Sequence, residues 1–168
     1  MTKDLFHKMC LKAEDLINSL NVDLKTINLV SGGAAWSDHV AIYLFLTNKY
    51  GKLTLYLPCH WNSDLIMHED NNKTGFIHNP DKSANKYHNN FSKVLGYNTL
   101  HDIENAKLNK AIIVDDNIGF HKRNTLISKS EYLIAFSWAK NEFSIEGGTL
   151  DTWKKCKGKK IHIDLACL

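Results

Sequence analysis

The sequence lacks any run of about 18 apolar residues, the length that a membrane-spanning helix needs. Its N-terminus carries charges and a histidine where a signal peptide needs a continuous apolar stretch. Internal repeats, low-complexity tracts and interdomain linkers are also absent. With 168 residues, 43% of them hydrophobic, the chain is large enough for one core and too short for two ordinary domains. We therefore expect a single cytoplasmic domain over residues 1–168, without membrane contact.

Cysteine and histidine motifs are missing as well. The four cysteines form no CxxC pair, so we predict free thiols, not a disulfide framework or a cysteine-based zinc site. The histidines show no HxH or HExxH spacing, and no Ser/His/Asp or Cys/His order gives a nucleophile motif. We predict no metal and no cofactor, and we interpret four histidines as scattered surface residues: His68, His78, His88 and His121.

Arginine is almost absent, because the 21 basic residues comprise twenty lysines and Arg123. A planar, bidentate guanidinium is favoured where the point charge of a lysine does not suffice, so Arg123 is a candidate binding residue. The net charge of +3 is too small to indicate nucleic acid. A local cluster is interpreted as a solvated helix end and loop, with no aromatic platform beside it, so nucleic acid is not an expected partner: Lys154, Lys155, Lys157, Lys159 and Lys160.

Hydrophobic periodicity alternates between strands and helices. Runs rich in β-branched residues predict strands at 26–30, 53–57, 110–114, 132–136 and 160–165. Helical spacing predicts helices at 4–20, 37–49, 84–95, 99–108, 120–128 and 147–155, with Asn98 or Thr99 as an N-cap. This order predicts an α/β fold: an open, mostly parallel Rossmann-like sheet flanked by helices. Residues 59–110 form a long insertion after the second strand, opening with a loop of about 25 residues from Cys59 to Ser83.

Two glycine turns follow strands. The first contains Ser31, Gly32, Gly33 and Ala34, and the second contains Gly147, Gly148 and Thr149, with Thr152 on the same helix face. Glycines let a ligand approach the backbone, and the helix that follows offers unpaired N–H groups and a positive dipole end. Both turns lie where ligands bind in open α/β sheets, so we predict that together they form one phosphate site.

The motif order resembles a known superfamily. Ser31-Gly-Gly-Ala-Ala-Trp-Ser-Asp38 after a strand, Phe120-His-Lys-Arg-Asn124, and Gly147-Gly-Thr-Leu-Asp-Thr152 after a further strand resemble the SLOG superfamily. That Rossmann-like group contains the lonely-guy phosphoribohydrolases, the DNA-processing protein A and nucleotide-sensing domains. The resemblance covers residues 26–57 and 118–165. It implies a nucleotide-derived ligand held by the first turn, by Arg123 with Asn124, and by the second turn.

The chain departs from the enzyme branch at one position. Lonely-guy enzymes carry a catalytic glutamate three residues beyond the threonine of the second motif, and Thr152 stands there in this sequence. If the chain is nevertheless a hydrolase, Asp38, Glu146 or Asp151 would supply the carboxylate that glycoside cleavage needs. The second motif is more similar to the DNA-processing and sensing branches, in which it grips a phosphate.

Further residues stand near the expected site. Asp38 is a candidate helix cap, ribose ligand or general acid or base, and Trp36 either stacks on a base or packs in the core. Three residues after the second strand and one in the insertion are candidates to line the pocket: Pro58, His60, Trp61 and His88. We expect the Cys59–Ser83 loop to be a lid or a dimer element.

Three functions remain open at this stage. The first is binding of a nucleotide-derived small molecule by a sensor, carrier or sequestering protein, which forms a homo-oligomer as members of the superfamily commonly do. The second is an N-glycoside hydrolase acting on a nucleoside monophosphate or an ADP-ribose-like compound. The third is single-stranded DNA binding, suggested by the DNA-processing resemblance and the lysine cluster.

Overall fold

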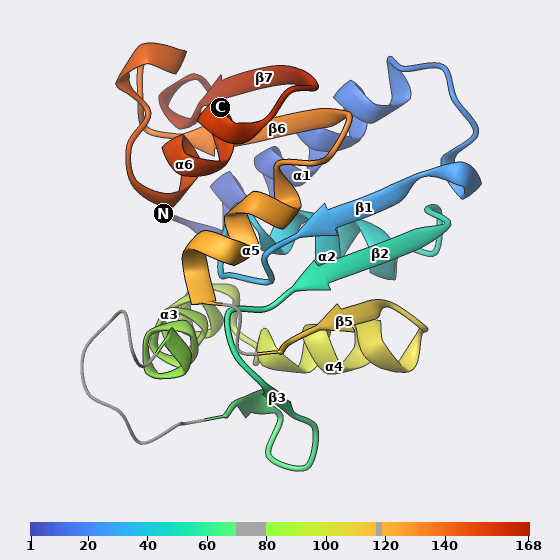
Figure 1. Cartoon of the computed structure of the whole chain (residues 1–168), viewed down its shortest axis with the longest axis vertical. Helices are drawn as coiled ribbons and strands as arrows, with labels where there is room; N and C mark the ends of the chain where they lie inside the picture. Colours follow the sequence, from blue (N-terminus) through green and yellow to red (C-terminus); the bar gives the residue numbers. More distant parts are fainter. Residues whose placement is uncertain (70–79, 117–118) are drawn as a thin grey trace.

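A computed structural model describes residues 1–69, 80–116 and 119–168, and it has the α/β fold that the sequence predicts (Figure 1). The helices are α1 (Lys3–Asn18), α2 (His39–Leu46), α3 (Pro80–Leu95), α4 (Leu100–Leu108), α5 (Gly119–Ile127) and α6 (Gly147–Lys155). The strands are β1 (Asn28–Ser31), β2 (Lys52–Tyr56), β3 (Trp61–Asn62), β4 (Met67–His68), β5 (Ile112–Val114), β6 (Tyr132–Ser137) and β7 (Lys159–Asp164). Short 3-10 turns lie at Leu24–Thr26, Glu142–Ser144 and Leu165–Cys167.

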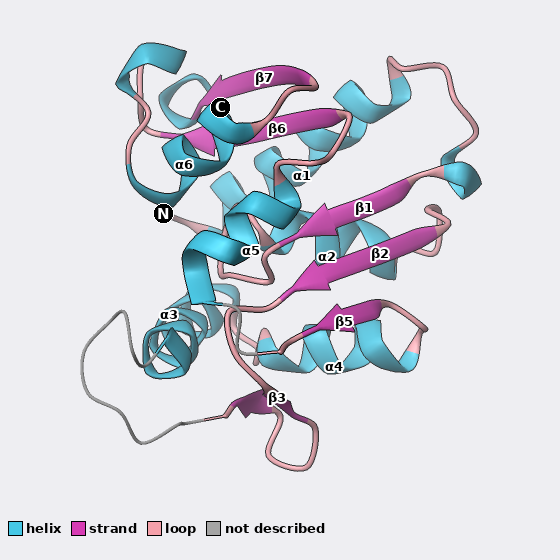
Figure 2. Ribbon diagram, in the orientation of Figure 1, coloured by secondary structure: helices cyan, strands magenta, loops and turns pink. Residues whose placement is uncertain are grey.

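Two parallel sheets, one of three strands and one of two, make up the main strand layer. β2 pairs with β1 on one side and with β5 on the other, and β6 pairs with β7. All five strands point the same way in Figure 2, so their carboxyl ends lie at one edge. The hydroxyl of Ser37, two residues before α2, donates to the carbonyl oxygen of Phe136 at 3.4 Å. This bond joins the start of α2 to the end of β6.

Apolar side chains of β2 form the centre of the core. Leu53 and Leu55 of β2 are buried, as is Leu57 just after it, and the intervening Thr54 is buried too, as expected for a central strand covered on both faces. Phe6 of α1 and Phe91 of α3 pack edge to face with ring centroids 5.1 Å apart. No helix in the described parts of the chain is both long and apolar enough to cross a membrane.

The insertion after β2 differs from the predicted 25-residue loop. A short antiparallel hairpin, β3–β4, occupies its start, and α3 begins at Pro80, four residues before the predicted helix. The prediction was wrong because proline fits the first helical turn and because a two-residue strand is too short to show alternation. Residues 70–79, where the rest of this loop was predicted, lie outside the described residues.

Candidate functional site

The first glycine turn is folded around the hydroxyl of Ser31. Ser31 Oγ donates to the carbonyl oxygen of Asp38 at 2.7 Å and accepts the Gly33 N–H at 3.1 Å. Gly33 has a φ of +66°, which favours glycine, and Gly32 and Gly33 are both buried. One buried hydroxyl therefore joins the end of β1 to the start of α2 and sets the shape of the turn between them.

Close packing explains why both positions are glycine. A Cβ on Gly32 would lie 2.5 Å from Asp38 Oδ2 and 2.8 Å from Arg123 Nε, and one on Gly33 would lie 2.4 Å from Leu57 Cδ2. These separations are shorter than van der Waals contact. The first turn is thus a place where α5 and β2 approach the backbone, and the protein's own side chains already fill the space beside it.

His88 of α3 fixes the orientation of a peptide in this turn. Its Nε2 lies 2.9 Å from the carbonyl oxygen of Gly33, which can only accept, so Nε2 carries the proton. Its Nδ1 then accepts from the Thr99 hydroxyl at 2.9 Å. Thr99 Oγ1 in turn lies 3.0 Å from Ser92 Oγ, which accepts the Thr99 N–H at 2.9 Å. Every donor in this series of hydrogen bonds, from Ser92 to Gly33, therefore has an acceptor.

The direction of the Gly33 carbonyl decides the direction of the next N–H. In a trans peptide the two groups point oppositely, so holding the carbonyl inward on His88 turns the Ala34 N–H away from α3. That N–H reaches Asp38 Oδ2 at 3.4 Å. Asp38 stands at the N-cap position of α2, but its side chain makes no capping bond there. Of the roles left open for it, the side-chain cap is therefore not observed, and the carboxylate faces the turn and Arg123 instead.

Burial keeps two histidines neutral. Burial first, and then the neighbouring His39, lower the pKa of His88 to about 4. Burial first, and then His88, lower the pKa of His68 to about 3. His68 Nδ1 lies 3.6 Å from Cys59 Sγ, whose pKa burial raises to about 12. The interpretation of His68 and His88 as surface residues was wrong, because both are fully buried; His121 is exposed, and His78 lies outside the described residues.

Arg123 lies against the first turn with only 11% of its side chain exposed. Its Nη1 is 3.5 Å from the carbonyl oxygen of Gly32 and 4.0 Å from Asp38 Oδ2. Its Nε and Nη2 both face Asn124 Oδ1, at 3.4 and 3.3 Å, and its guanidinium carbon lies 5.2 Å from the Phe120 ring centroid. One edge of the guanidinium thus faces the first turn, another edge faces Asn124, and its flat face lies near the Phe120 ring. A lysine cannot make this set of contacts.

Asn124 continues this connection to the second glycine turn. Its Nδ2 donates to Asp151 Oδ2 at 3.1 Å and to the carbonyl oxygen of Gly148 at 3.4 Å. Thr152, at the position of the lonely-guy glutamate, donates its hydroxyl to the same Gly148 oxygen at 3.1 Å and is buried. The two adjacent side chains Arg123 and Asn124 therefore bring both glycine turns into one continuous network.

The three candidate catalytic carboxylates occupy different surroundings. Asp38 is about one third exposed and lies beside Arg123. Asp151 is bonded by Lys155 at 2.9 Å, and this bond, with that from Asn124, lowers the pKa of Asp151. Glu146 is exposed at the N-cap of α6 and makes no capping bond there. Of the three, Asp38 is the one that contacts the first turn.

The residues expected to line the pocket are spread around this edge. Pro58 is buried, and Trp61 is buried with its indole N–H donating to Glu104 at 2.7 Å. Trp36, partly buried and at a φ of +65°, packs on Phe91 with ring centroids 4.4 Å apart. The structure thus gives Trp36 and Trp61 packing contacts within the protein.

Asp115 is a further residue at this edge that the sequence reasoning missed. It follows β5 directly, accepts the Trp61 N–H at 2.8 Å, and lies 3.1 Å from Nδ1 of the exposed His60. Two aspartates directly after a predicted strand were the signal that could have indicated it. Within the described ranges, no three His, Cys, Asp or Glu side chains are arranged to hold a metal ion.

Comparison with known proteins shows that the chain is similar to a viral protein. No family model matches it, and no solved structure matches it. It is 35% identical over 169 residues to an uncharacterized protein of Acanthamoeba polyphaga mimivirus, an alignment that covers 99% of this chain and 87% of the viral protein. The aligned region therefore includes both glycine turns. The chain belongs to the same protein family as this mimivirus protein.

Proposed function

We propose that this protein binds a nucleotide or nucleotide-derived signalling molecule, with its phosphate held between the two glycine turns, as the SLOG resemblance implies. The observation that carries the proposal is the bridge between the turns. Arg123 reaches the carbonyl oxygen of Gly32, and the adjacent Asn124 reaches that of Gly148. An arginine that packs against the first glycine turn, and that Asn124 joins to the second, has the charge and the planar geometry that phosphate recognition uses.

Backbone donors at the second turn complement the arginine. Gly147, Gly148 and Thr149 open α6, a nine-residue helix whose N-cap, Glu146, provides no side-chain bond. Gly147 and Gly148 are exposed, and Thr149 is partly exposed. The first N–H groups of a helix have no partner within the helix and lie at its positive dipole end, which favours an anion. A phosphate there would meet these N–H groups on one side and Arg123 on the other.

Binding fits the observed contacts better than hydrolysis does. A buried, bonded hydroxyl occupies the position of the lonely-guy glutamate, and Asp151 is already held by Lys155. The role we assign is therefore that of a sensor, carrier or sequestering protein. Asp38, beside Arg123, is the carboxylate on which the alternative, a nucleotide N-glycosidase, would depend.

Calorimetry and product analysis test both roles. The full chain is titrated with nucleoside monophosphates and cyclic ADP-ribose isomers, and each mixture is assayed for free base. We expect binding of at least one compound without base release; base release that Asp38→Asn abolishes would establish the hydrolase instead. A native mass spectrum of the purified protein reports any co-purified ligand and whether the chain is a homodimer.

Replacing Arg123 tests the carrying observation. Arg123→Lys keeps the charge and loses the planar fork, so we expect ligand binding to weaken by about 1–3 kcal/mol, the usual scale for a hydrogen bond to a charged group. The neighbouring, exposed Lys122 supplies the control, because Lys122→Arg makes the reverse exchange outside the network. Equal affinity of Arg123→Lys and the parent would remove Arg123 from the site.

A further inference from the structure

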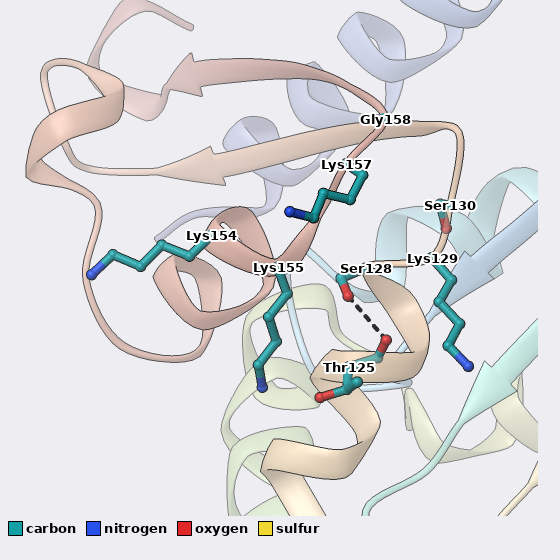
Figure 3. A pocket seen from close by; sticks show the side chains of 8 residues that line it. All are labelled: Thr125, Ser128, Lys129, Ser130, Lys154, Lys155, Lys157 and Gly158. Carbon is teal, nitrogen blue, oxygen red and sulfur yellow. Dashed lines mark hydrogen bonds between the residues drawn. The ribbon is translucent and has the colours of Figure 1, made fainter.

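A second charged surface lies away from the glycine turns. It is an open depression of about 580 Å³ between the last turns of α5 and α6 and the start of β7, and we call it the lysine depression (Figure 3). Its lining includes Lys129, Lys154, Lys155 and Lys157, with Thr125 and Ser128 between them. Because β6 and β7 begin beside it, it stands at the amino edge of these strands, opposite the glycine turns.

Most of the positive charge here is not neutralised by the protein. Lys155 pairs with Asp151, but the side chains of Lys129, Lys154 and Lys157 make no hydrogen bond or ion pair with residues 1–69, 80–116 and 119–168. Segments 125–132 and 151–160 together hold six lysines against Glu131 and Asp151, an excess of four that exceeds the net charge of +3 of the whole chain. The remainder of the protein is therefore slightly acidic, and the basic charge is concentrated at this one place.

The hydroxyl groups in the depression are already used. Thr125 donates to the carbonyl oxygen of His121 at 3.0 Å, Ser128 to that of Thr125 at 2.9 Å, and Ser130 to that of Ile127 at 2.8 Å. The lysine ammonium groups are then the donors left for a ligand. Point charges of this kind recognise phosphates without reading bases.

An aromatic ring stands next to these lysines. A second depression, of about 460 Å³, adjoins the first, since Lys157 and Gly158 line both. The other residues that line it are Glu131, Tyr132 and Lys159. Tyr132 is 41% exposed. The Nζ atom of Lys159 lies over its ring, 5.5 Å from the ring centroid. The prediction that no aromatic platform lies beside the lysine cluster was wrong. Tyr132 was missed because it stands more than twenty residues before the cluster in the sequence.

We propose that the lysine depression binds a single strand of nucleic acid, with its phosphates on Lys129, Lys154 and Lys157 and a base stacked on Tyr132. A basic groove with an exposed ring beside it is the combination that sequence-independent single-strand binding uses. A membrane surface fits less well, because the lining offers lysines and hydroxyls and no large aliphatic side chain that would insert between lipids. This site is separate from the nucleotide site proposed above, and neither proposal depends on the other.

Fluorescence anisotropy with a labelled 20-nucleotide single strand tests the phosphate contacts. The triple variant Lys129→Ala, Lys154→Ala, Lys157→Ala should bind at least about tenfold more weakly at 50 mM KCl. A plot of the logarithm of the association constant against the logarithm of the salt concentration should become less steep by about 2, because each phosphate contact that is lost removes about 0.7 from the slope. The control is a triple variant with the same charge change elsewhere, Lys3→Ala, Lys52→Ala, Lys93→Ala, which should change the affinity less than about twofold. Equal losses in the two triple variants would overturn the proposal.

Two further arms separate this proposal from its rivals. Tyr132→Ala should weaken binding of the single strand about fivefold, the low end of base stacking on an aromatic ring, and should leave duplex binding unchanged, while Tyr132→Phe binds as the parent does. Binding to phosphatidylserine vesicles but not to the oligonucleotide would overturn the proposal.

Discussion

The two glycine turns have similar sequences and opposite surroundings. In the first, a methyl group added to Gly32 or Gly33 would overlap Asp38, Arg123 or Leu57 at 2.4 to 2.9 Å. In the second, a methyl group on Gly147 would meet nothing within 4 Å, and one on Gly148 would touch only Asn124 Nδ2, at 3.6 Å. Glycine in the first turn is required by packing, whereas in the second turn it leaves open space.

This difference assigns the turns different parts in one site. The first turn is held by Ser31 and His88, so its peptide orientations are set before any ligand arrives. The second turn presents exposed backbone at a helix start, where a ligand has access. The first turn therefore positions Arg123 and Asp38, and the second provides the open backbone donors.

The largest expected effect comes from adding a methyl group to the packed turn. Gly33→Ala combines a positive φ with overlap on Leu57, so we expect the free energy of unfolding to fall by about 2–4 kcal/mol, the sum of backbone strain and overpacking. Gly147→Ala has a similar φ, +62°, in open space, and should cost about 1–2 kcal/mol, the strain alone. Urea denaturation measures both. Equal losses would mean that the packing at Gly33 adds nothing.

Removing His88 should have the next largest effect. His88→Leu leaves the Gly33 carbonyl and the Thr99 hydroxyl without their partner, so we expect a loss of about 1–3 kcal/mol at pH 7. His88→Gln retains a donor and should lose less. If both variants are as stable as the parent, then His88 does not hold the first turn.

The same histidine should make stability depend on pH. In the folded protein the pKa values of His68 and His88 are about 3 and about 4, below the ordinary value of 6.5. At a pH between the folded and the ordinary value, the unfolded chain therefore binds more protons than the folded protein does. Stability is then full above pH 6.5 and falls as the pH is lowered toward 4. The slope between pH 7 and 5 should flatten in His88→Gln and stay as in the parent in His121→Gln, whose ring is exposed.

The smallest effect on stability, and the sharpest separation of the turns, is expected at Gly148. Its added methyl group makes an ordinary contact, so Gly148→Ala should change the free energy of unfolding by less than about 0.5–1 kcal/mol, the ordinary helix-propensity range. It should nevertheless weaken nucleotide binding, because the methyl group stands where a phosphate would approach the backbone. Unchanged binding by calorimetry would place the phosphate elsewhere.

Predictions from the sequence were most accurate where one pattern decides the structure. The α6 helix was predicted to begin at Gly147 and end near Lys155, as it does, because glycine turns and helical spacing are local signals. The hairpin β3–β4 was missed, since its two-residue strands are formed by Trp61 and Asn62 pairing with His68 and Met67 and leave no periodicity. Asp38 was placed correctly at the start of α2, but its carboxylate turns to a residue 85 positions away.

The sequence by itself determined the α/β order of elements, the two glycine turns and the singular position of Arg123, because each depends on neighbouring residues or on composition. Tertiary structure alone decided that His88 would be buried and hold Gly33, and that Arg123 with Asn124 would join two turns more than a hundred residues apart. It also decided that Tyr132 would stand beside the lysine cluster. These relations arise from packing between segments distant in the chain, where burial, and not local propensity, selects which polar groups meet.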